Sequence, residues 1–156
     1  MVTPLRSKVA QVCAALNDQD ARYVLVGAQA MIVWGGGRNT RDIDLLIEAT
    51  PKNAQRVLDG LEAMGFILVR DLDAADVARR PVTMIGDLYR VDLMTIAWAI
   101  RYPEASREAH TFTVDSVAVP TASIRHLIAS KRTGRPQDAA DIEVLEEIAR
   151  QKGQPL

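Results

Sequence analysis

The chain has 156 residues, 48% of them hydrophobic and 25% charged, with a net charge of -1 at pH 7, as in an ordinary globular protein of one domain. The balanced charge excludes a global basic field for non-specific nucleic-acid binding, and the single cysteine, Cys13, excludes an internal disulfide. We find neither a signal peptide nor an apolar run as long as a membrane span, so we expect a cytoplasmic domain over residues 1–156 without membrane association.

The first third of the chain predicts helices and strands in alternation. A hydroxyl followed by proline at Thr3-Pro4 predicts a helix start. Apolar residues then follow at helical spacing: Leu5, Val9, Val12 and Leu16. Tyr23–Val26 predicts a short buried strand that Gly27 ends, and Ala28–Trp34 predicts a short helix on the sheet. Gly35, Gly36 and Gly37 stop that helix.

The middle of the chain predicts a further strand, a helix and another strand. Asp42–Ile47 alternates as a strand does, and Thr50-Pro51 begins a helix that stops at Gly65. Phe66–Val69 predicts a strand. The charged segment 71–80 suits either a surface helix or a loop.

The last part predicts two hairpins and two helices. Val82–Ile85 and Leu88–Met94 flank a Gly-Asp turn, and a shorter pair spans residues 112–114 and 117–119. The closing helices are predicted at Thr121–Arg132 and Pro136–Lys152. This order predicts an α/β (α+β) fold with a mixed sheet, its core at about residues 20–120 and C-terminal helices within 121–152.

Asp42 and Asp44 are the most informative pair in the chain. Because side chains alternate along a strand, both point to one face while the aliphatic side chains between and beyond them point to the other. Like charges side by side on a sheet repel each other, and a cation between them removes that cost. Oxygen ligands of this kind suit Mg2+ or Mn2+.

Two further features extend the paired aspartates into a candidate catalytic site. Asp92 lies in the alternating strand that begins at Arg90, and it would complete a three-carboxylate cluster if the two strands are neighbours. Such a cluster can hold two divalent ions for displacement at phosphorus. Gly27-Ala28 lies between a strand and a helix, where free N–H groups attract phosphate.

The chain resembles the nucleotidyltransferase superfamily of the DNA polymerase β type at these positions. The matching pieces are Leu25–Ala28, then Asp42–Leu45 after a gap of 13 residues from Gln29 to Arg41, then Arg90–Leu93. The string 38–45 and the string 131–142 look similar to small bacterial stand-alone members, including those related to abortive-infection and toxin–antitoxin nucleotidyltransferases. The resemblance covers roughly residues 20–148.

The resemblance implies a nucleotidyltransferase fold, an ATP- or other NTP-binding site and a role for each matching residue. Asp42, Asp44 and Asp92 would bind magnesium, with Asp92 also activating the attacking hydroxyl. The triphosphate would be held by Gly27, Ala28, Arg38, Arg41, Lys131 and Arg135. Asp138 and Asp141 would support the C-terminal side of the cleft.

One residue departs from the family pattern. Relatives commonly have Ser or Gly after the first glycine, whereas Ala28 keeps the backbone N–H but lacks a hydroxyl for the terminal phosphates. Two functions therefore stay open: an Mg2+-dependent nucleotidyltransferase, as a possible toxin–antitoxin component, or an inactive nucleotide-binding or protein-interaction module. The resemblance implies that the nucleotide is transferred to an RNA, a protein or a small molecule. The shortness of the chain suggests that a partner protein or a second copy of the chain completes or controls the site.

Simpler interpretations stand beside these roles. The paired aspartates could be solvated, Asp92 could form a salt bridge with Arg90, and Gly27 could be a turn glycine. Arg38 and Arg41 could be surface charges. Asp138 could serve the dipole of the last helix, and Asp141 needs a partner such as Lys131 or Arg135. We expect His110 and His126 to be non-catalytic, and Cys13, Trp34 and Trp98 to pack. A glycosyltransferase or a dehalogenase-type phosphatase would also use an Asp-x-Asp motif, but the sequence around Asp42 suits neither.

Overall fold

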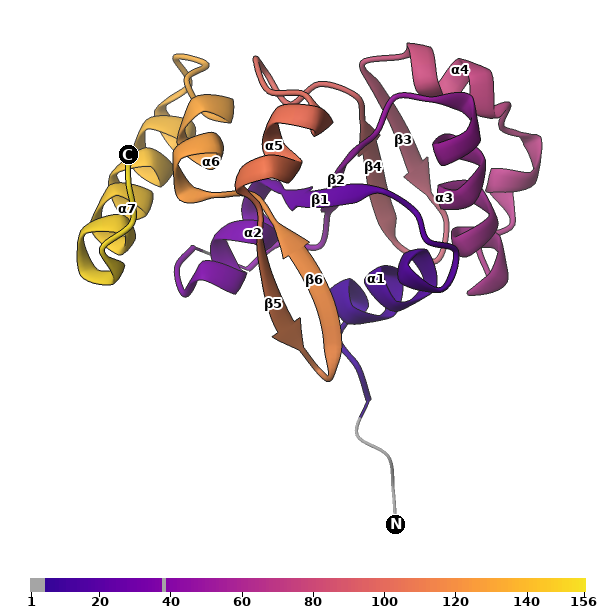
Figure 1. Ribbon diagram of the computed structural model, residues 1–156, viewed down its shortest axis with the longest axis horizontal. Coiled ribbons are helices and arrows are strands. Elements are labelled where there is room, and N and C mark those ends of the chain that lie inside the picture. Colours follow the sequence, from indigo (N-terminus) through magenta and orange to yellow (C-terminus); the bar gives the residue numbers. More distant parts are fainter. Residues whose placement is uncertain (1–4, 38) are drawn as a thin grey trace.

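A mixed β-sheet forms the centre of the computed structural model, which describes residues 5–37 and 39–156 (Figure 1). Within these residues the strands are β1 (Tyr23–Val26), β2 (Ile43–Ile47), β3 (Val82–Gly86), β4 (Arg90–Met94), β5 (His110–Val114) and β6 (Val117–Thr121). They form one sheet in the order β3-β4-β2-β1-β6-β5. The predicted α/β fold with a mixed sheet is confirmed.

Helices cover the sheet and extend beyond it at the C-terminal end (Figure 1). They are α1 (Lys8–Asp18), α2 (Gly27–Trp34), α3 (Pro51–Ala63), α4 (Ala74–Arg79), α5 (Tyr102–Glu108), α6 (Ile124–Ser130) and α7 (Pro136–Lys152), with a 3-10 turn at Leu68–Asp71. The Thr50 hydroxyl accepts a hydrogen bond from the Asn53 N–H and caps α3, as its sequence predicts. Among the residues described, no helix has the length and apolar character that crossing a membrane requires.

The two acidic strands are neighbours in the sheet. β2 and β4 pair in parallel, with Asp44 opposite Asp92, and β1 pairs antiparallel with β2, with Val26 opposite Asp44. Residues directly opposite one another share a face of the sheet. Asp44 and Asp92 therefore lie side by side, next to the end of β1 from which α2 begins.

The other face of the same strands is part of the hydrophobic core. The Tyr23 hydroxyl donates to the Asn17 side chain of α1 at 2.7 Å, so the Tyr23 face is turned toward α1. Ile47 pairs with Tyr23 and shares that face with Leu45 and Ile43, all three fully buried. α1 and α3 meet closely above this core, because a Cβ on Gly60 would lie 2.9 Å from the Ala15 carbonyl oxygen. The predicted alternation of aliphatic and acidic residues is confirmed.

The first helix begins later than the sequence suggested. α1 starts at Lys8, and the Ser7 hydroxyl caps it by accepting from the Ala10 N–H at 3.2 Å. Leu5, which the helical spacing places on the apolar stripe, is outside the helix and 97% exposed. Thr3-Pro4 lies outside the described residues. The Ser7 cap, two residues before the first buried stripe residue, Val9, thus sets the start of the helix.

The predicted strand at Phe66–Val69 is wrong. The chain instead enters the 3-10 turn at Leu68, and the Asp87 carboxylate accepts hydrogen bonds from the Ile67 and Leu68 N–H groups at 2.7 and 2.8 Å. Those donors are therefore unavailable for a strand ladder. The adjoining ambiguous segment 71–80 contains α4.

The predicted helix at Thr121–Arg132 is wrong at its start. Thr121 is the last residue of β6, and α6 begins only after Ser123, whose hydroxyl accepts from the His126 N–H. α5 was not predicted at all. Both hairpins and the helix Pro136–Lys152 are confirmed.

Candidate functional site

Asp44 and Asp92 are neighbours where β2 and β4 run side by side, and Asp42 lies close by. Asp44 and Asp92 are register partners, and Asp42 lies one residue before β2. The Asp92 side chain is 12% exposed and the Asp42 side chain 47%. Exposure therefore increases from the buried Asp92 through the partly buried Asp44 to the accessible Asp42.

The surroundings of Asp44 disfavour its ionised form. Burial raises the pKa of Asp44 from 3.8 to about 6, and the negative charges of Asp92 and Asp42 act in the same direction, while the Arg90 guanidinium opposes them. A buried carboxylate beside two others is destabilised when it ionises. A bound cation would relieve that repulsion.

Arg90 already neutralises part of the cluster. Its guanidinium donates to both carboxylate oxygens of Asp92 at 3.1 Å and lies 3.9 Å from Asp42. The salt bridge that the sequence allowed for Asp92 is therefore formed. Across residues 5–37 and 39–156, no three His, Cys, Asp or Glu side chains converge into a ready metal-binding group. The donor set is nevertheless the all-oxygen kind that Mg2+ and Mn2+ prefer, and the Arg90 side chain beside it is half-exposed.

Gly27 is required by close contact with this cluster. Its φ is +69°, and a Cβ at this position would lie 2.2 Å from the Asp44 Oδ2 atom. Any side chain here would displace the Asp44 carboxylate. Gly27 also begins α2, so its backbone and that of Ala28 lie at a helix N-terminus beside the carboxylates.

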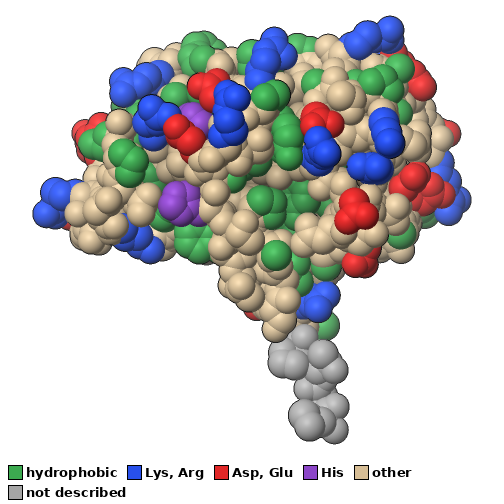
Figure 2. Space-filling view, in the orientation of Figure 1, with side chains coloured by type: hydrophobic (Ala, Val, Ile, Leu, Met, Phe, Trp, Pro, Cys, Tyr) green, Lys and Arg blue, Asp and Glu red, His purple; other side chains and the backbone are tan. Residues whose placement is uncertain are grey.

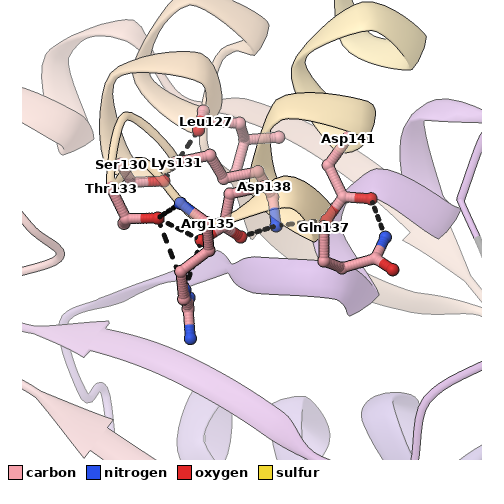
Figure 3. Close-up of polar contacts among 8 residues, drawn as sticks. All are labelled: Leu127, Ser130, Lys131, Thr133, Arg135, Gln137, Asp138 and Asp141. Carbon is pink, nitrogen blue, oxygen red and sulfur yellow. Dashed lines mark hydrogen bonds and ion pairs between the residues drawn. The ribbon is translucent and has the colours of Figure 1, made fainter.

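A second group of charges joins the end of α6 to the start of α7. Figure 3 shows the Lys131 side chain reaching between Asp138 and Asp141, with its ammonium 2.8 Å from Asp141 and 3.8 Å from Asp138. The Arg135 Nε lies 2.6 Å from Asp138, whose carboxylate also accepts from the Thr133 hydroxyl (Figure 3). Lys131 provides the partner that the sequence required for Asp141.

This second group is nearly neutral as a whole. Lys131, Asp138 and Asp141 are all buried, while the Arg135 side chain is 74% exposed. Burial opposes ionisation of Asp138, but hydrogen bonds from Thr133 and Arg135 and the nearby positive charges outweigh it and hold its pKa below the ordinary value. The pairs fix α7 against α6, and Arg135 is the cation best placed to reach an incoming anion.

A pocket of about 160 Å³ connects the two groups. It is lined by Val26, Gly27, Asp44, Met94, Ala97, Trp98, Ser130, Lys131, Arg135 and Asp138. Half of these lining residues were predicted from the sequence as site residues, although they come from separate parts of the chain. A whole nucleotide needs more room, because pockets for drug-sized ligands measure about 300–1,000 Å³. The enclosed part suits phosphate groups.

Other predicted residues lie around this pocket without lining it. Ala28 follows the lining residue Gly27, and Asp42 lies two residues before Asp44. Asp92 is the register partner of Asp44, and Asp141 forms an ion pair with Lys131. Arg41 is exposed. Arg38 lies outside the described residues.

The two tryptophans differ in a way that the sequence did not reveal. Trp34 is buried and donates to the Ala122 carbonyl at 2.9 Å, as expected of a packing residue. Trp98 is 60% exposed and lines the pocket, so its predicted packing role is wrong. The only sequence signal for its exposure is that Trp98, between two alanines, belongs to no apolar stripe of a helix or strand.

The remaining candidates lie away from the carboxylates. Cys13 is buried, and burial raises the pKa of its thiol to about 11. His126 is buried with its Nε2 3.3 Å from Glu108. A larger hollow of about 680 Å³ lies near His110 and the C-terminal residues and contains none of the predicted site residues. On one face of the molecule, acidic and basic side chains are interspersed (Figure 2).

Comparison with solved structures identifies the fold. The lincomycin-bound lincosamide antibiotic adenylyltransferase LnuA aligns with a TM-score of 0.57 at 15% identity, over 88% of this chain and 93% of that one. An antigenic nucleotidyltransferase-like protein from Paracoccidioides brasiliensis aligns with a TM-score of 0.56 at 16% identity, over 95% of this chain and 78% of that one. No protein-family model matches the sequence, and no curated protein sequence matches it significantly. The chain therefore has the fold of nucleotidyltransferases, as its motifs predicted.

Proposed function

We propose that this protein is an Mg2+-dependent nucleotidyltransferase that moves a nucleoside monophosphate from an NTP to a hydroxyl acceptor. The observation that carries the proposal is the pocket in which Asp44 meets the glycine turn at Gly27 and the cations Lys131 and Arg135. A carboxylate beside the backbone N–H groups at the start of α2, with two cations across the pocket, suits a metal-bound triphosphate. The shared fold agrees with this chemistry.

In the proposed reaction, the acceptor oxygen forms a bond to the α-phosphorus and the bond to the bridging oxygen breaks, releasing pyrophosphate. Asp42, Asp44 and Asp92 would hold the metal, which would neutralise charge developing on the phosphates. Asp92 would take the hydroxyl proton once Arg90 turns away from it. The backbone of Gly27 and Ala28 would hold the phosphates, with Arg135 facing them across the pocket.

A direct labelling assay tests this function. The purified protein is incubated with Mg2+ and NTPs labelled at the α-phosphate, with candidate RNA, protein and small-molecule acceptors in separate reactions. We expect labelling that Asp44→Asn abolishes and that the exposed-residue control Asp71→Asn leaves unchanged. Failure to bind any NTP and to label any acceptor would refute the proposal.

The order in which acceptor classes are tested follows from a structural neighbour. LnuA is described as an adenylyltransferase for a lincosamide antibiotic, so a hydroxyl-bearing small molecule is the first class to test. RNA 3′ ends and protein hydroxyls are the other classes. A toxin–antitoxin role predicts that induced expression arrests growth and that Asp44→Asn relieves the arrest.

A second candidate is a catalytically inactive nucleotide-binding or protein-interaction module. Two observations favour it: Ala28 stands where the family commonly has Ser or Gly and lacks the hydroxyl that Ser would supply, and the Arg90 guanidinium donates to both oxygens of Asp92. Calorimetry that shows nucleotide binding in Mg2+ without any turnover would favour this candidate over the enzyme.

A further inference from the structure

Trp98 lies at the first central position of a tight turn. The Ala97 N–H donates to the Ile100 carbonyl at 2.8 Å, and the Ile100 N–H donates back to Ala97 at 3.0 Å. The φ of Trp98 is +58°, in the left-handed region that favours glycine at this position of a hairpin turn. The other described non-glycine residues with positive φ are Asp20, Asp115 and Ser116, which are small and polar. A bulky aromatic here is strained.

Packing does not compensate for that strain. The Trp98 side chain is 60% exposed, whereas Ala97 and Ile100, which anchor the turn, are 3% and 7% exposed. The Trp34 side chain, by contrast, is 3% exposed and packs in the hydrophobic core. A strained backbone that presents an aromatic ring to solvent is a feature of ligand-binding sites.

The ring is placed at the pocket described above. Trp98 lines it together with Asp44 and Gly27 on one side and Lys131 and Arg135 on the other. The enclosed volume of about 160 Å³ suits phosphates, so the nucleoside of a bound NTP must lie at the rim. An exposed indole at that rim offers a flat apolar surface of the size of a base.

We propose that Trp98 is the platform on which the nucleobase of the bound NTP stacks. This inference rests on the proposed nucleotide site and adds a residue that determines affinity within it. Because every base has a π-face, stacking contributes affinity without selecting one base. ATP and CTP should therefore depend on Trp98 to a similar extent.

Calorimetry in Mg2+ with a non-hydrolysable ATP analogue and with inorganic tripolyphosphate tests the inference. Trp98→Gly suits the turn, so this variant should be at least as stable as the wild type in urea unfolding. We expect Trp98→Gly to weaken binding of the analogue about 5- to 150-fold, the range of one lost base–aromatic stack. Its affinity for tripolyphosphate should stay within about twofold, and Trp98→Phe should keep most of the nucleotide affinity.

Fluorine NMR of protein labelled with 5-fluorotryptophan gives a second readout. The signal that is missing from Trp98→Phe should shift on addition of the ATP analogue and not of tripolyphosphate, while the Trp34 signal should stay in place. If neither ligand binds the wild type, the proposed function fails and this inference falls with it. If both bind but Trp98→Gly binds the analogue normally, or if the variant unfolds, the stacking role alone is overturned. A Trp98 signal that responds only to single-stranded RNA also overturns it.

Discussion

Replacing Asp44 by asparagine separates the charge of this residue from its shape. In the native protein the pKa of Asp44 is raised from 3.8 to about 6 by burial and by Asp92 and Asp42. Between about pH 4 and pH 6, Asp44 therefore holds a proton more often in the folded chain than in the unfolded chain. Because stability rises with pH only where the unfolded state binds more protons, this group makes stability fall as pH rises through that range.

The size of the effect follows from the pKa change. A difference of this size corresponds to about 3 kcal/mol at neutral pH, and partial solvent access reduces it to about 2–3 kcal/mol. The asparagine side chain of the variant carries no charge at any pH. The stability of Asp44→Asn relative to the wild type should therefore increase by about 2 kcal/mol between pH 4 and pH 7.5, whatever the steric effect of the amide.

Urea unfolding followed by circular dichroism, with a chelator present, measures this difference at each pH. The control Asp71→Asn changes an exposed carboxylate outside the cluster and should show no such trend. Adding Mg2+ at ten times its dissociation constant should stabilise the wild type by about 1.4 kcal/mol and Asp44→Asn much less. A relative stability of Asp44→Asn that is the same at pH 4 and pH 7.5 would show that Asp44 is not the buried, repelled acid described above.

Three further substitutions test other parts of the site. Gly27→Ala should destabilise the fold by about 2–4 kcal/mol in urea unfolding, more than Gly153→Ala, which shares the positive φ but meets no atom within 4 Å; equal losses would show that the contact with the Asp44 carboxylate is unimportant. Lys131→Met should cost about 3 kcal/mol because it removes the buried ammonium that pairs with Asp141 and Asp138, and a thermal melt equal to that of the wild type would contradict this. Ala28→Ser should tighten ATP binding about tenfold in calorimetry by adding a hydroxyl donor to the phosphates, and unchanged affinity would place the phosphates elsewhere.

The acidic strands could be predicted because their pattern is local. Alternation placed Asp42 and Asp44 on one face and Ile43 and Leu45 on the other, and strand geometry alone dictates that arrangement. The long C-terminal helix was predicted to the residue, since proline begins it and glycine follows its end.

Hydrogen bonds to residues distant in sequence explain the two elements that were predicted wrongly. Ile67 and Leu68 have strand-like side chains, yet the Asp87 carboxylate, about 20 residues away, takes their N–H groups. Likewise, β6 continues to Thr121, which lies opposite His110 in the hairpin, so α6 can start only afterwards. Such hydrogen bonds depend on residues distant in sequence, and a local pattern does not contain them.

By itself the sequence determined which residues carry charge, which strands bear the acids and where a glycine must interrupt the chain. Only the tertiary structure decided that Asp44 lies against the Gly27 backbone, that Arg90 neutralises Asp92, and that the Trp98 ring stands exposed at the pocket. The physical reason is distance along the chain. Side-chain periodicity acts over a few residues, whereas burial, repulsion between carboxylates and the shape of a pocket arise only when separate segments meet.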